Sequence, residues 1–262
     1  MPVKLLFIGD IVGKSGRQAI SRELHRLVDR HMVDLVIANG ENAAGGFGLT
    51  EEVAGDLFKL GIDLLTSGNH IWDKRDSLDY VKRETRLVRP ANYPEGTPGL
   101  GSALLRTAGG VKVAVLNLEG RVFMNNLECP FRVADREIAR LEQETPIVLV
   151  DFHAEATSEK GALAWYLDGR VSAVIGTHTH VQTADERILP AGTAFISDAG
   201  MTGAFDSVIG IRKDEAIQKF LTQMPVKFEV AKSNIRLNGV VVEIDEESGK
   251  ALGITRVNIC CD

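Results

Sequence analysis

The sequence is poor in the features that mark secreted and membrane proteins. Only three of its 262 residues are cysteine, Cys129, Cys260 and Cys261, and their spacing fits neither a zinc finger nor an even set of disulfides. No apolar run reaches the roughly 18 residues that span a bilayer, and the N-terminus lacks a basic segment followed by a long apolar stretch. We therefore expect a cytoplasmic protein with reduced thiols and no membrane partner.

Positive charge is also in short supply. With 30 Lys and Arg against 36 Asp and Glu, the formal net charge is −6. Binding along a nucleic acid requires clustered Lys and Arg, so the sequence predicts no extended nucleic-acid surface. A small phosphate ester is still an acceptable substrate, because bound metal ions can dominate the field in a site. The sequence leaves the oligomeric state open, a homo-oligomer included.

The chain does contain many short apolar segments of the kind buried in a parallel sheet. In its first third they alternate with segments of helical periodicity. Ile20, Leu24 and Leu27, for example, recur at intervals that define one helical face. The strands expected here are 4–8, 34–38 and 63–66, and the helices are the segments 20–28 and 51–60.

The rest of the chain mixes strands, helices and one long loop. Residues 90–101 are rich in Pro and Gly and predict that loop. Beyond it we expect strands at 103–107, 111–116, 146–150, 171–175, 193–197, 226–230, 239–244 and 253–258, and helices at 133–141, 159–167 and 214–221. Because the sequence has neither a linker nor a long internal repeat, we expect one domain over residues 1–262. The elements predict an α/β protein with two mixed sheets packed together and helices outside.

Polar side chains stand where the apolar runs end, and they are Asp10, Glu41, Asn42, Asn69, His70, His153, His178 and His180. In an open α/β sheet, ligands gather beyond the carboxyl ends of the strands, so residues scattered along the chain can meet there. Carboxylate, amide and imidazole groups without thiolate form a ligand set suited to two borderline divalent metals. Two such metals about 3.5–4 Å apart are the usual machinery for displacement at phosphorus, so the sequence predicts a dinuclear metallophosphoesterase.

Several of these residues also have an ordinary structural explanation. His178 and His180 are two apart at the end of a strand and would point to the same face, but either could be a loop histidine bonded to a carbonyl. Asn69 could cap a helix, and His153 could be a buried structural histidine. Asn42 could ligate a metal, orient a water or hold the turn.

The acids and the remaining histidine suggest a division of roles. Asp10 and Glu41 would supply the negative charge that two dications need, although an acid after a strand can equally compensate a helix dipole. His70, beside an amide ligand, would stay free to handle a proton. Asp198 ends another strand and would either line the same crevice or cap a turn.

A rival motif lies at the first strand. Residues 9–15 read Gly-Asp-Ile-Val-Gly-Lys-Ser and resemble a phosphate-binding P-loop, but that loop has four residues between its glycines and this segment has three. One of the three is an acid, where an anion would be disfavoured. Lys14, Arg17 and Arg121 lie near strand ends and are candidate phosphate contacts, although each is better explained as a solvated charge.

The candidate ligands and their neighbours resemble the ligand motifs of the calcineurin-like metallophosphoesterases. The residues that carry this resemblance are Asp10, Asn69, His70, His153, His178 and His180. The resemblance is closer to the YmdB-type branch, bacterial phosphodiesterases that act on cyclic nucleotides. It rests on GDIVG at 9–13, NGENAAGG at 39–46, GNHIWD at 68–73, DFHAEAT at 151–157 and HVQTAD at 180–185. The likeness extends over nearly the whole chain.

The resemblance implies a four-layer αββα sandwich and assigns roles to the site residues. Glu41 would bridge the two metals, with Asp10 and His180 completing one site. The other site would be completed by Asn69, His153 and His178. His70 would donate a proton to the leaving oxygen. The metals would be iron or manganese, and a ligand set of this kind also accepts zinc.

The sequence departs from the wider superfamily in two places. Val12 stands where the first motif usually has a histidine, and Glu41 with Asn42 replaces the usual aspartate bridge of the second motif. Both departures match the YmdB-type branch. They leave open whether Asn42 replaces the lost histidine ligand.

The expected reaction is hydrolysis of 2′,3′- or 3′,5′-cyclic nucleotides, in which a hydroxide bridging the metals attacks phosphorus and His70 protonates the departing alkoxide. The alternative from another class is a regulatory or sensor protein that binds a nucleotide with little turnover. Within the enzyme class, a phosphomonoesterase or a nuclease is also open, because specificity depends on loops whose arrangement the sequence does not give.

Overall fold

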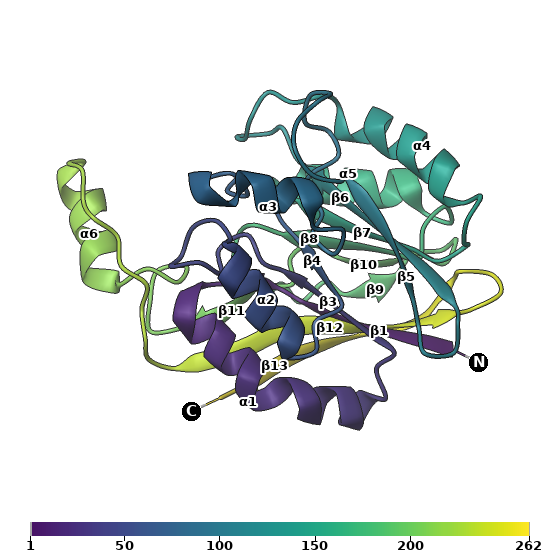
Figure 1. The fold of residues 1–262 in the computed structure, drawn as a ribbon, viewed down its shortest axis with the longest axis horizontal. Helices are drawn as coiled ribbons and strands as arrows, with labels where there is room; N and C mark the ends of the chain where they lie inside the picture. Colours follow the sequence, from purple (N-terminus) through teal and green to yellow (C-terminus); the bar gives the residue numbers. More distant parts are fainter. Residues whose placement is uncertain (1, 262) are drawn as a thin grey trace.

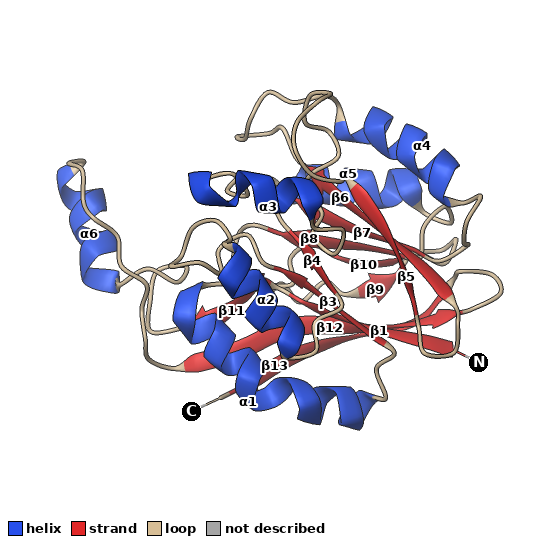
Figure 2. Cartoon of the chain, in the orientation of Figure 1, coloured by secondary structure: helices blue, strands red, loops and turns tan. Residues whose placement is uncertain are grey.

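Two β-sheets lie face to face, with helices on both outer sides (Figures 1 and 2). The computed structural model describes residues 2–261. The strands of the first sheet are β1 (Pro2–Ile8), β2 (Asp10–Ile11), β3 (Leu35–Asn39), β4 (Leu64–Thr66), β11 (Met201–Ala204), β12 (Ile235–Asp245) and β13 (Ala251–Cys260). Their order is β2-β11-β12-β1-β3-β4, and β13 also pairs with β12. β1, β3 and β4 run parallel, whereas β12 runs antiparallel to β1, so the sheet is mixed.

The second sheet is mixed as well. Its strands are β5 (Ser102–Arg106), β6 (Lys112–Glu119), β7 (Val148–His153), β8 (Ala173–Thr177), β9 (Arg187–Ile188) and β10 (Ala194–Ile196). In the order β5-β6-β7-β8-β10-β9, the four central strands are parallel and the two edge strands are antiparallel. Parallel central strands place their carboxyl ends along one edge, which is where a site is expected.

Helices cover the outer faces of both sheets. The first sheet is covered by α1 (Gly13–His31), α2 (Glu51–Lys59) and α3 (Leu78–Arg83), the last preceded by the short 3₁₀ helix η1 (Arg75–Ser77). The second is covered by α4 (Pro130–Leu141) and α5 (Thr157–Leu167). A sixth helix, α6 (Lys213–Thr222), projects from the body, as Figure 1 shows at the left. We refer to residues 206–233, which carry it, as the α6 arm.

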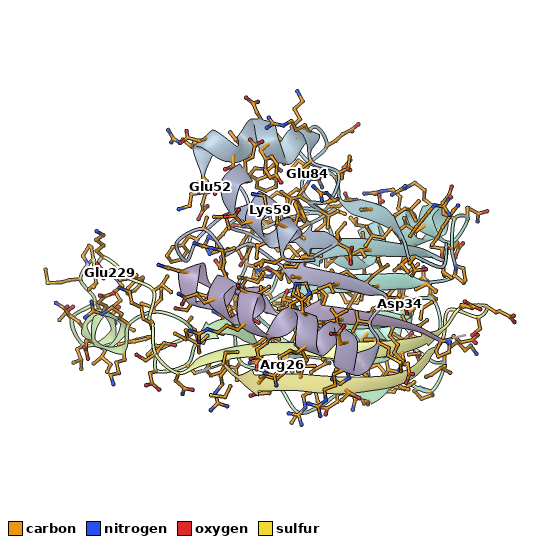
Figure 3. All side chains as sticks on the ribbon, turned by 60° about the horizontal axis from the view of Figure 1, so that its bottom comes forward. Arg26, Asp34, Glu52, Lys59, Glu84 and Glu229 are labelled. Carbon is orange, nitrogen blue, oxygen red and sulfur yellow. The ribbon has the colours of Figure 1, made fainter. Side chains whose placement is uncertain are left out.

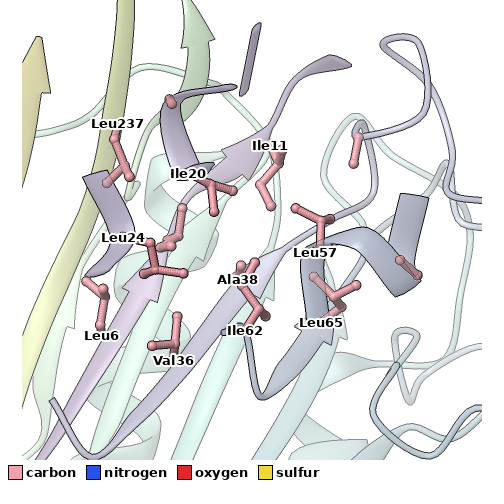
Figure 4. Close-up of a cluster of buried hydrophobic side chains, with 14 of the residues drawn as sticks. Leu6, Ile11, Ile20, Leu24, Val36, Ala38, Leu57, Ile62, Leu65 and Leu237 are labelled. Atoms are coloured by element: carbon pink, nitrogen blue, oxygen red, sulfur yellow. The ribbon is translucent and has the colours of Figure 1, made fainter. Parts of the chain in front are cut away.

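Local sequence explains where these helices begin and which face they bury. Thr50 caps α2, because its Oγ1 accepts a hydrogen bond from the backbone N–H of Val53 at 3.3 Å. α1 buries Ile20 and Leu24 against the first sheet (Figure 4). Its outer face is charged, and Figure 3 shows Arg26 there; the Arg26 side chain is 79% exposed. Burial of each large aliphatic side chain on the inner face stabilises the fold by about 1.5–3 kcal/mol.

Three hydrophobic layers separate the four structural layers. One lies between α1–α3 and the first sheet, and a second between the second sheet and α4 with α5. The third fills the space between the sheets, where Phe7 of β1 packs in the same cluster as Val115 of β6 and Ile175 of β8. The predicted fold class, a four-layer αββα sandwich of two mixed sheets, is therefore confirmed.

The predicted strand at 226–230 is wrong. Apart from a single bridge between Ile211 and Val230, this segment pairs with no strand in residues 2–261, and it forms the return path of the α6 arm. The apolar alternation has another cause. Val230 packs against the backbone of Gly13 and Gly46, so close that a Cβ on Gly46 would lie 2.7 Å from Cγ2 of Val230.

The P-loop interpretation is also wrong. The backbone N–H groups of Gly9, Val12 and Gly13 each donate to a backbone carbonyl elsewhere in the fold, so they are not free to surround a phosphate. Residues 10–11 instead form β2, which pairs with β11.

Two further features concern membranes and thiols. None of the helices in residues 2–261 combines the length and apolarity needed to cross a bilayer. Cys129, Cys260 and Cys261 are all free thiols, and Cys261 is buried.

Candidate metal centre

All eight predicted site residues lie together at the carboxyl ends of strands from both sheets. The first sheet supplies Asp10, Glu41, Asn42, Asn69 and His70 from β2 and the segments that follow β3 and β4. The second sheet supplies His153, the last residue of β7, and His178 and His180 from the segment after β8. The centre therefore lies between the two sheets.

One group of donor atoms surrounds the His153 ring. Its Nε2 lies 3.0 Å from Glu41 Oε1, 3.0 Å from His178 Nδ1 and 3.2 Å from Asn69 Oδ1. Ligand atoms of the two histidines and Glu41 all fall within 4.8 Å of one another, an arrangement that could hold a metal ion. His153 and Glu41 are almost completely buried, at 0% and 1% exposure.

A second group of donor atoms lies beside the first. His180 Nε2 is 3.8 Å from Asp10 Oδ1 and 3.3 Å from Asn42 Nδ2. The same Asn42 nitrogen is 3.1 Å from Glu41 Oε1, so the Asn42 amide lies between the two groups. Asp10 Oδ1 is buried and finds no hydrogen-bond partner among residues 2–261, which is costly unless a cation satisfies it.

The outer ring nitrogens show which nitrogen of each histidine is free to ligate. His180 Nδ1 lies 2.8 Å from the carbonyl oxygen of Ile209, which can only accept, so Nδ1 carries the proton and Nε2 is bare. His178 Nε2 lies 3.2 Å from Glu155 Oε2, which likewise leaves Nδ1 bare toward the centre.

A third outer contact fixes the His153 ring. Its Nδ1 lies 2.9 Å from the Thr177 hydroxyl, which donates to Asp151 Oδ1 at 2.7 Å. Thr177 then accepts from His153 Nδ1–H, so Nε2 is the nitrogen available to a cation. Metal-ligating histidines typically donate their other N–H to an oxygen in this way. Each of the three rings therefore turns one nitrogen into the centre, close to the other rings and to the oxygens of Glu41 and Asn69, an arrangement that fits a cation.

The electrostatics of the buried groups reflect this crowding. Burial raises the pKa of Asp10 above its ordinary value. Burial also acts to raise the pKa of Glu41, but the charge and hydrogen bond of His153 outweigh it and lower that pKa to about 2. The same pair raises the pKa of His153 to about 9 against the opposing effect of burial. Burial and the neighbouring His153 charge lower the pKa of His178 to about 3. Without a metal ion, the Glu41 carboxylate therefore favours a proton on His153 Nε2, and a bound cation would displace that proton.

Gly68 explains why the turn before Asn69 has no side chain. A Cβ on Gly68 would lie 2.3 Å from Glu41 Oε2 and 2.4 Å from His153 Nε2. Only glycine leaves room for the donor atoms at this position.

His70 is placed differently from the ligand candidates. Its Nδ1 lies 2.8 Å from Asp73 Oδ2, and its side chain is 31% exposed where it lines a cavity over the centre. Its backbone N–H donates to Glu41 Oε2 at 3.2 Å. The ring is therefore oriented by a carboxylate and reaches the cavity without joining the buried donor groups.

The prediction that His178 and His180 share one strand face is wrong, although both reach the centre. β8 ends at Thr177, and the two histidines adopt φ values of 98° and 65° in the following loop. Asp198 holds this loop by accepting from the backbone N–H of Thr179 at 3.0 Å and from its hydroxyl at 2.7 Å. Of its two predicted roles, Asp198 has that of capping the turn.

The three predicted phosphate contacts do not reach the cavity over the centre. None of Lys14, Arg17 and Arg121 lines the cavity, and Arg17 instead donates to the carbonyl of Ala43. The sequence predicted no role for the residues that orient the histidines, which are Asp151, Thr177, Glu155 and Ile209. Asp151 is two residues from His153 on β7, a spacing that could have indicated it. The carbonyl of Ile209 leaves no sequence signal.

The cavity over the centre has a volume of about 390 Å³. A larger one, of about 580 Å³ beside β5 and α4, contains none of the predicted site residues, and we give it no role in the chemistry.

Comparison with known proteins identifies the family. Residues 6–257 match the family described as YmdB-like protein. The chain belongs to the YmdB-like family. This YmdB-like protein is 50% identical over 257 residues to the 2′,3′-cyclic-nucleotide 2′-phosphodiesterase of Bacillus subtilis, covering 98% of this chain and 97% of the relative.

Solved structures agree. A protein of Thermus thermophilus described as hypothetical has a TM-score of 0.92 and 43% identity, covering 98% of this chain and 99% of the other. A phosphatase of Mycoplasma pneumoniae has a TM-score of 0.93 and 36% identity, covering 99% and 94%. The predicted resemblance is confirmed, and so is the enzyme class, since the relatives with functional names are hydrolases of phosphoric esters.

Proposed function

We propose that this YmdB-like protein hydrolyses the phosphodiester bond of small cyclic nucleotides, with 2′,3′-cyclic nucleotides as its main substrates, using two divalent metal ions. The observation that carries the proposal is the convergence of bare imidazole nitrogens, carboxylates and amide groups between the two sheets. The name of the Bacillus subtilis relative supports the choice of substrate. The proposal also includes 3′,5′-cyclic nucleotides as a second class of substrate. It places the enzyme in the cytoplasm.

In this proposal the two donor groups hold one metal each and share Glu41. Asp10 and His180 belong to the first site, and the Asn42 amide, between the groups, is its further ligand once its oxygen faces the metal. The second site consists of Asn69, His153 and His178. The unpartnered Asp10 Oδ1 supports the first assignment, and the three short contacts of His153 Nε2 support the second. Iron or manganese suits such a mixed nitrogen and oxygen set, and zinc is also accepted.

When bound, such a pair of cations supplies an activated water and offsets the negative charge of the phosphoryl oxygens. The protein itself supplies the proton for the leaving group. His70 is held through Nδ1 by Asp73, which leaves Nε2 to deliver a proton to the alkoxide as the cyclic phosphate opens. The buried acids and histidines keep the phosphorus end of the substrate away from bulk water.

The proposal is tested by metal analysis of the purified protein together with hydrolysis of 2′,3′-cyclic AMP and 3′,5′-cyclic AMP. We expect about two transition-metal ions per chain after reconstitution with iron or manganese, and cleavage that a chelator abolishes. Glu41→Gln should lose metal and activity, whereas Glu144→Gln, at a surface ion pair with Lys112, should lose neither. Bound metal without turnover of either substrate would favour a nucleotide sensor, and failure to bind metal would overturn the assignment of the donor groups.

A further inference from the structure

We propose that the apolar wall of the cavity, formed by Phe47, Ile209, Ile211 and Phe228, is a nucleobase subsite that holds the base of a cyclic mononucleotide by stacking. The proposal rests on the proposed phosphodiesterase function and adds to it how the substrate is selected.

The cavity has two chemically distinct sides. The metal centre forms one side, with Glu41, Asn42 and the histidines. The apolar wall forms the other, and its large side chains are unusually open to solvent, with Phe47 at 37%, Ile209 at 53% and Phe228 at 40% exposure. An aromatic surface exposed beside a centre of charged groups matches a nucleotide, which is apolar at the base and ionic at the phosphate. A volume of about 390 Å³ lies in the range of pockets for one small ligand.

The wall is fixed in place before a substrate arrives. Phe228 belongs to the return path of the α6 arm, where the backbone of Arg212 donates to Glu229 at 2.9 Å and that of Ala231 donates to Gly210 at 2.9 Å. These hydrogen bonds flank Val230 and anchor the backbone directly after Phe228 to residues 210–212. Val230, two residues on, packs against the body of the protein. Because the backbone that carries Phe228 is already anchored, less conformational entropy is lost when a base stacks on its ring.

The rest of the wall is tied directly to the metal centre. Ile209 accepts the hydrogen bond from His180 Nδ1 through its carbonyl oxygen, so its backbone is anchored to a proposed ligand. Phe47 meets the His70 ring edge to face, with 5.3 Å between centroids and an interplanar angle of 71°. A base on this wall would therefore place its phosphate at a defined distance from both the donor groups and His70.

The charge of the cavity limits what else could bind. The described residues that line it include no Lys or Arg, while Glu41 and Glu155 are both present. Beyond the proposed metal ions, no lining Lys or Arg is available to hold the additional phosphate groups of a triphosphate, so a mononucleotide suits the cavity better. The wall also presents no polar side chain to a base edge, so discrimination among bases should depend on stacking area. Purines should therefore be preferred modestly over pyrimidines.

The test compares substrates with and without a base. Steady-state kcat and KM would be measured for 2′,3′-cyclic AMP, 2′,3′-cyclic CMP and the base-free methyl riboside 2,3-cyclic phosphate. Phe228→Ala should raise KM for the two nucleotides at least about 5-fold, with the larger increase for the purine, and leave the base-free substrate unchanged. The matched control is Phe220→Ala, because Phe220 is a 71%-exposed phenylalanine on the same arm that does not line the cavity. It should change none of these values.

The outcomes separate this inference from the proposed function. An equal effect of Phe228→Ala on the nucleotides and on the base-free substrate would overturn the subsite, as would no effect on any of them. If the unaltered protein cleaved none of the three, the proposed function itself would fail. Should Phe228→Ala not fold, as judged by its melting curve, Phe228→Leu keeps the apolar volume without the aromatic face. It should still raise KM for the purine, and an unchanged KM would overturn the proposal.

Discussion

Glu41 and His70 touch, yet their surroundings suit them to different tasks. Glu41 is buried, and its Oε1 contacts His153 of one donor group and the Asn42 amide beside the other. His70 is partly exposed, and only its backbone N–H contacts the Glu41 carboxylate. The chemistry of the two side chains can therefore be separated by mutation.

His70→Ala should keep both metals and lose most turnover, because it removes only the proton donor. General acid catalysis typically contributes about 10²–10⁴-fold, so kcat for 2′,3′-cyclic AMP should fall by that range. Glu41→Ala should lose both metals, since it removes a ligand common to the two groups. Metal content by elemental analysis and kcat from the same preparations check the prediction. Equal loss of metal in the two variants would contradict the division of roles.

Thr177 offers a second test at the scale of the residue. Thr177→Val keeps the shape of the side chain but removes the hydroxyl that links His153 Nδ1 to Asp151. The His153 ring then loses its orientation, and affinity for manganese, measured by calorimetry, should fall about 10–100-fold. Thr193→Val removes an equally buried hydroxyl, which donates to the carbonyl of Val171 away from the centre. It should leave the affinity unchanged, and a similar loss in both variants would show a merely structural effect.

At the scale of the element, α5 and the loop after β8 are joined by a buried ion pair. Lys160 of α5 lies 2.8 Å from Asp198 Oδ2, and both side chains are 2% exposed. Asp198 also holds Thr179, the residue between the two loop histidines. The packing of α5 on the second sheet is thereby linked to the loop that carries His178 and His180.

Lys160→Met should destabilise the protein by about 3–5 kcal/mol, because it leaves the Asp198 carboxylate buried without its partner. The comparison is Lys112→Met, which breaks a surface pair with Glu144 whose side chains are 32% and 46% exposed. That variant should lose about 1 kcal/mol or less. The free energy of unfolding in urea measures both, and similar losses would contradict the role given to the buried pair.

The elements also show what sequence patterns predict and what they miss. Apolar runs located the buried strands, such as β7, because a strand covered on both faces begins with several apolar residues in succession. Short strands such as β2 and β11 were missed, since two to four residues carry no periodicity. The strand at 226–230 was predicted wrongly, because its alternate apolar residues have other roles. Phe228 lines the cavity and Val230 packs on Gly13 and Gly46, and neither role requires a neighbouring strand.

The sequence predicted which residues gather at the site better than it predicted how they are arranged there. Residue types at strand ends indicated the eight centre residues, because parallel strands bring their carboxyl ends to one edge. The left-handed conformations of His178 and His180 depend on Asp198, which is distant in sequence. The hydrogen bond from His180 is accepted by the backbone carbonyl of Ile209, so it does not depend on which side chain stands at position 209. Patterns of residue type cannot contain such contacts.

At the scale of the whole molecule, the centre lies across two sheets that pack against each other. The first sheet contributes Asp10, Glu41 and Asn69, and the second contributes His153 and His178. Between the sheets lies a hydrophobic layer that includes Phe7 and Val115. Metal ions bound by both sets of residues would act as cross-links between the sheets at their carboxyl edge.

Metal binding should therefore raise the melting temperature, because it stabilises the folded state and the unfolded chain cannot assemble the donor groups. A metal at 100 times its dissociation constant contributes about 2.7 kcal/mol per site. Differential scanning calorimetry of chelator-treated protein, with and without added manganese, measures the shift. His70→Ala should keep the full shift and Glu41→Gln should lose it, since the Glu41 carboxylate, unlike the His70 ring, lies among donor atoms of both sheets. A full shift in Glu41→Gln would mean that the ions bind elsewhere, and the cross-link between the sheets would then be wrong.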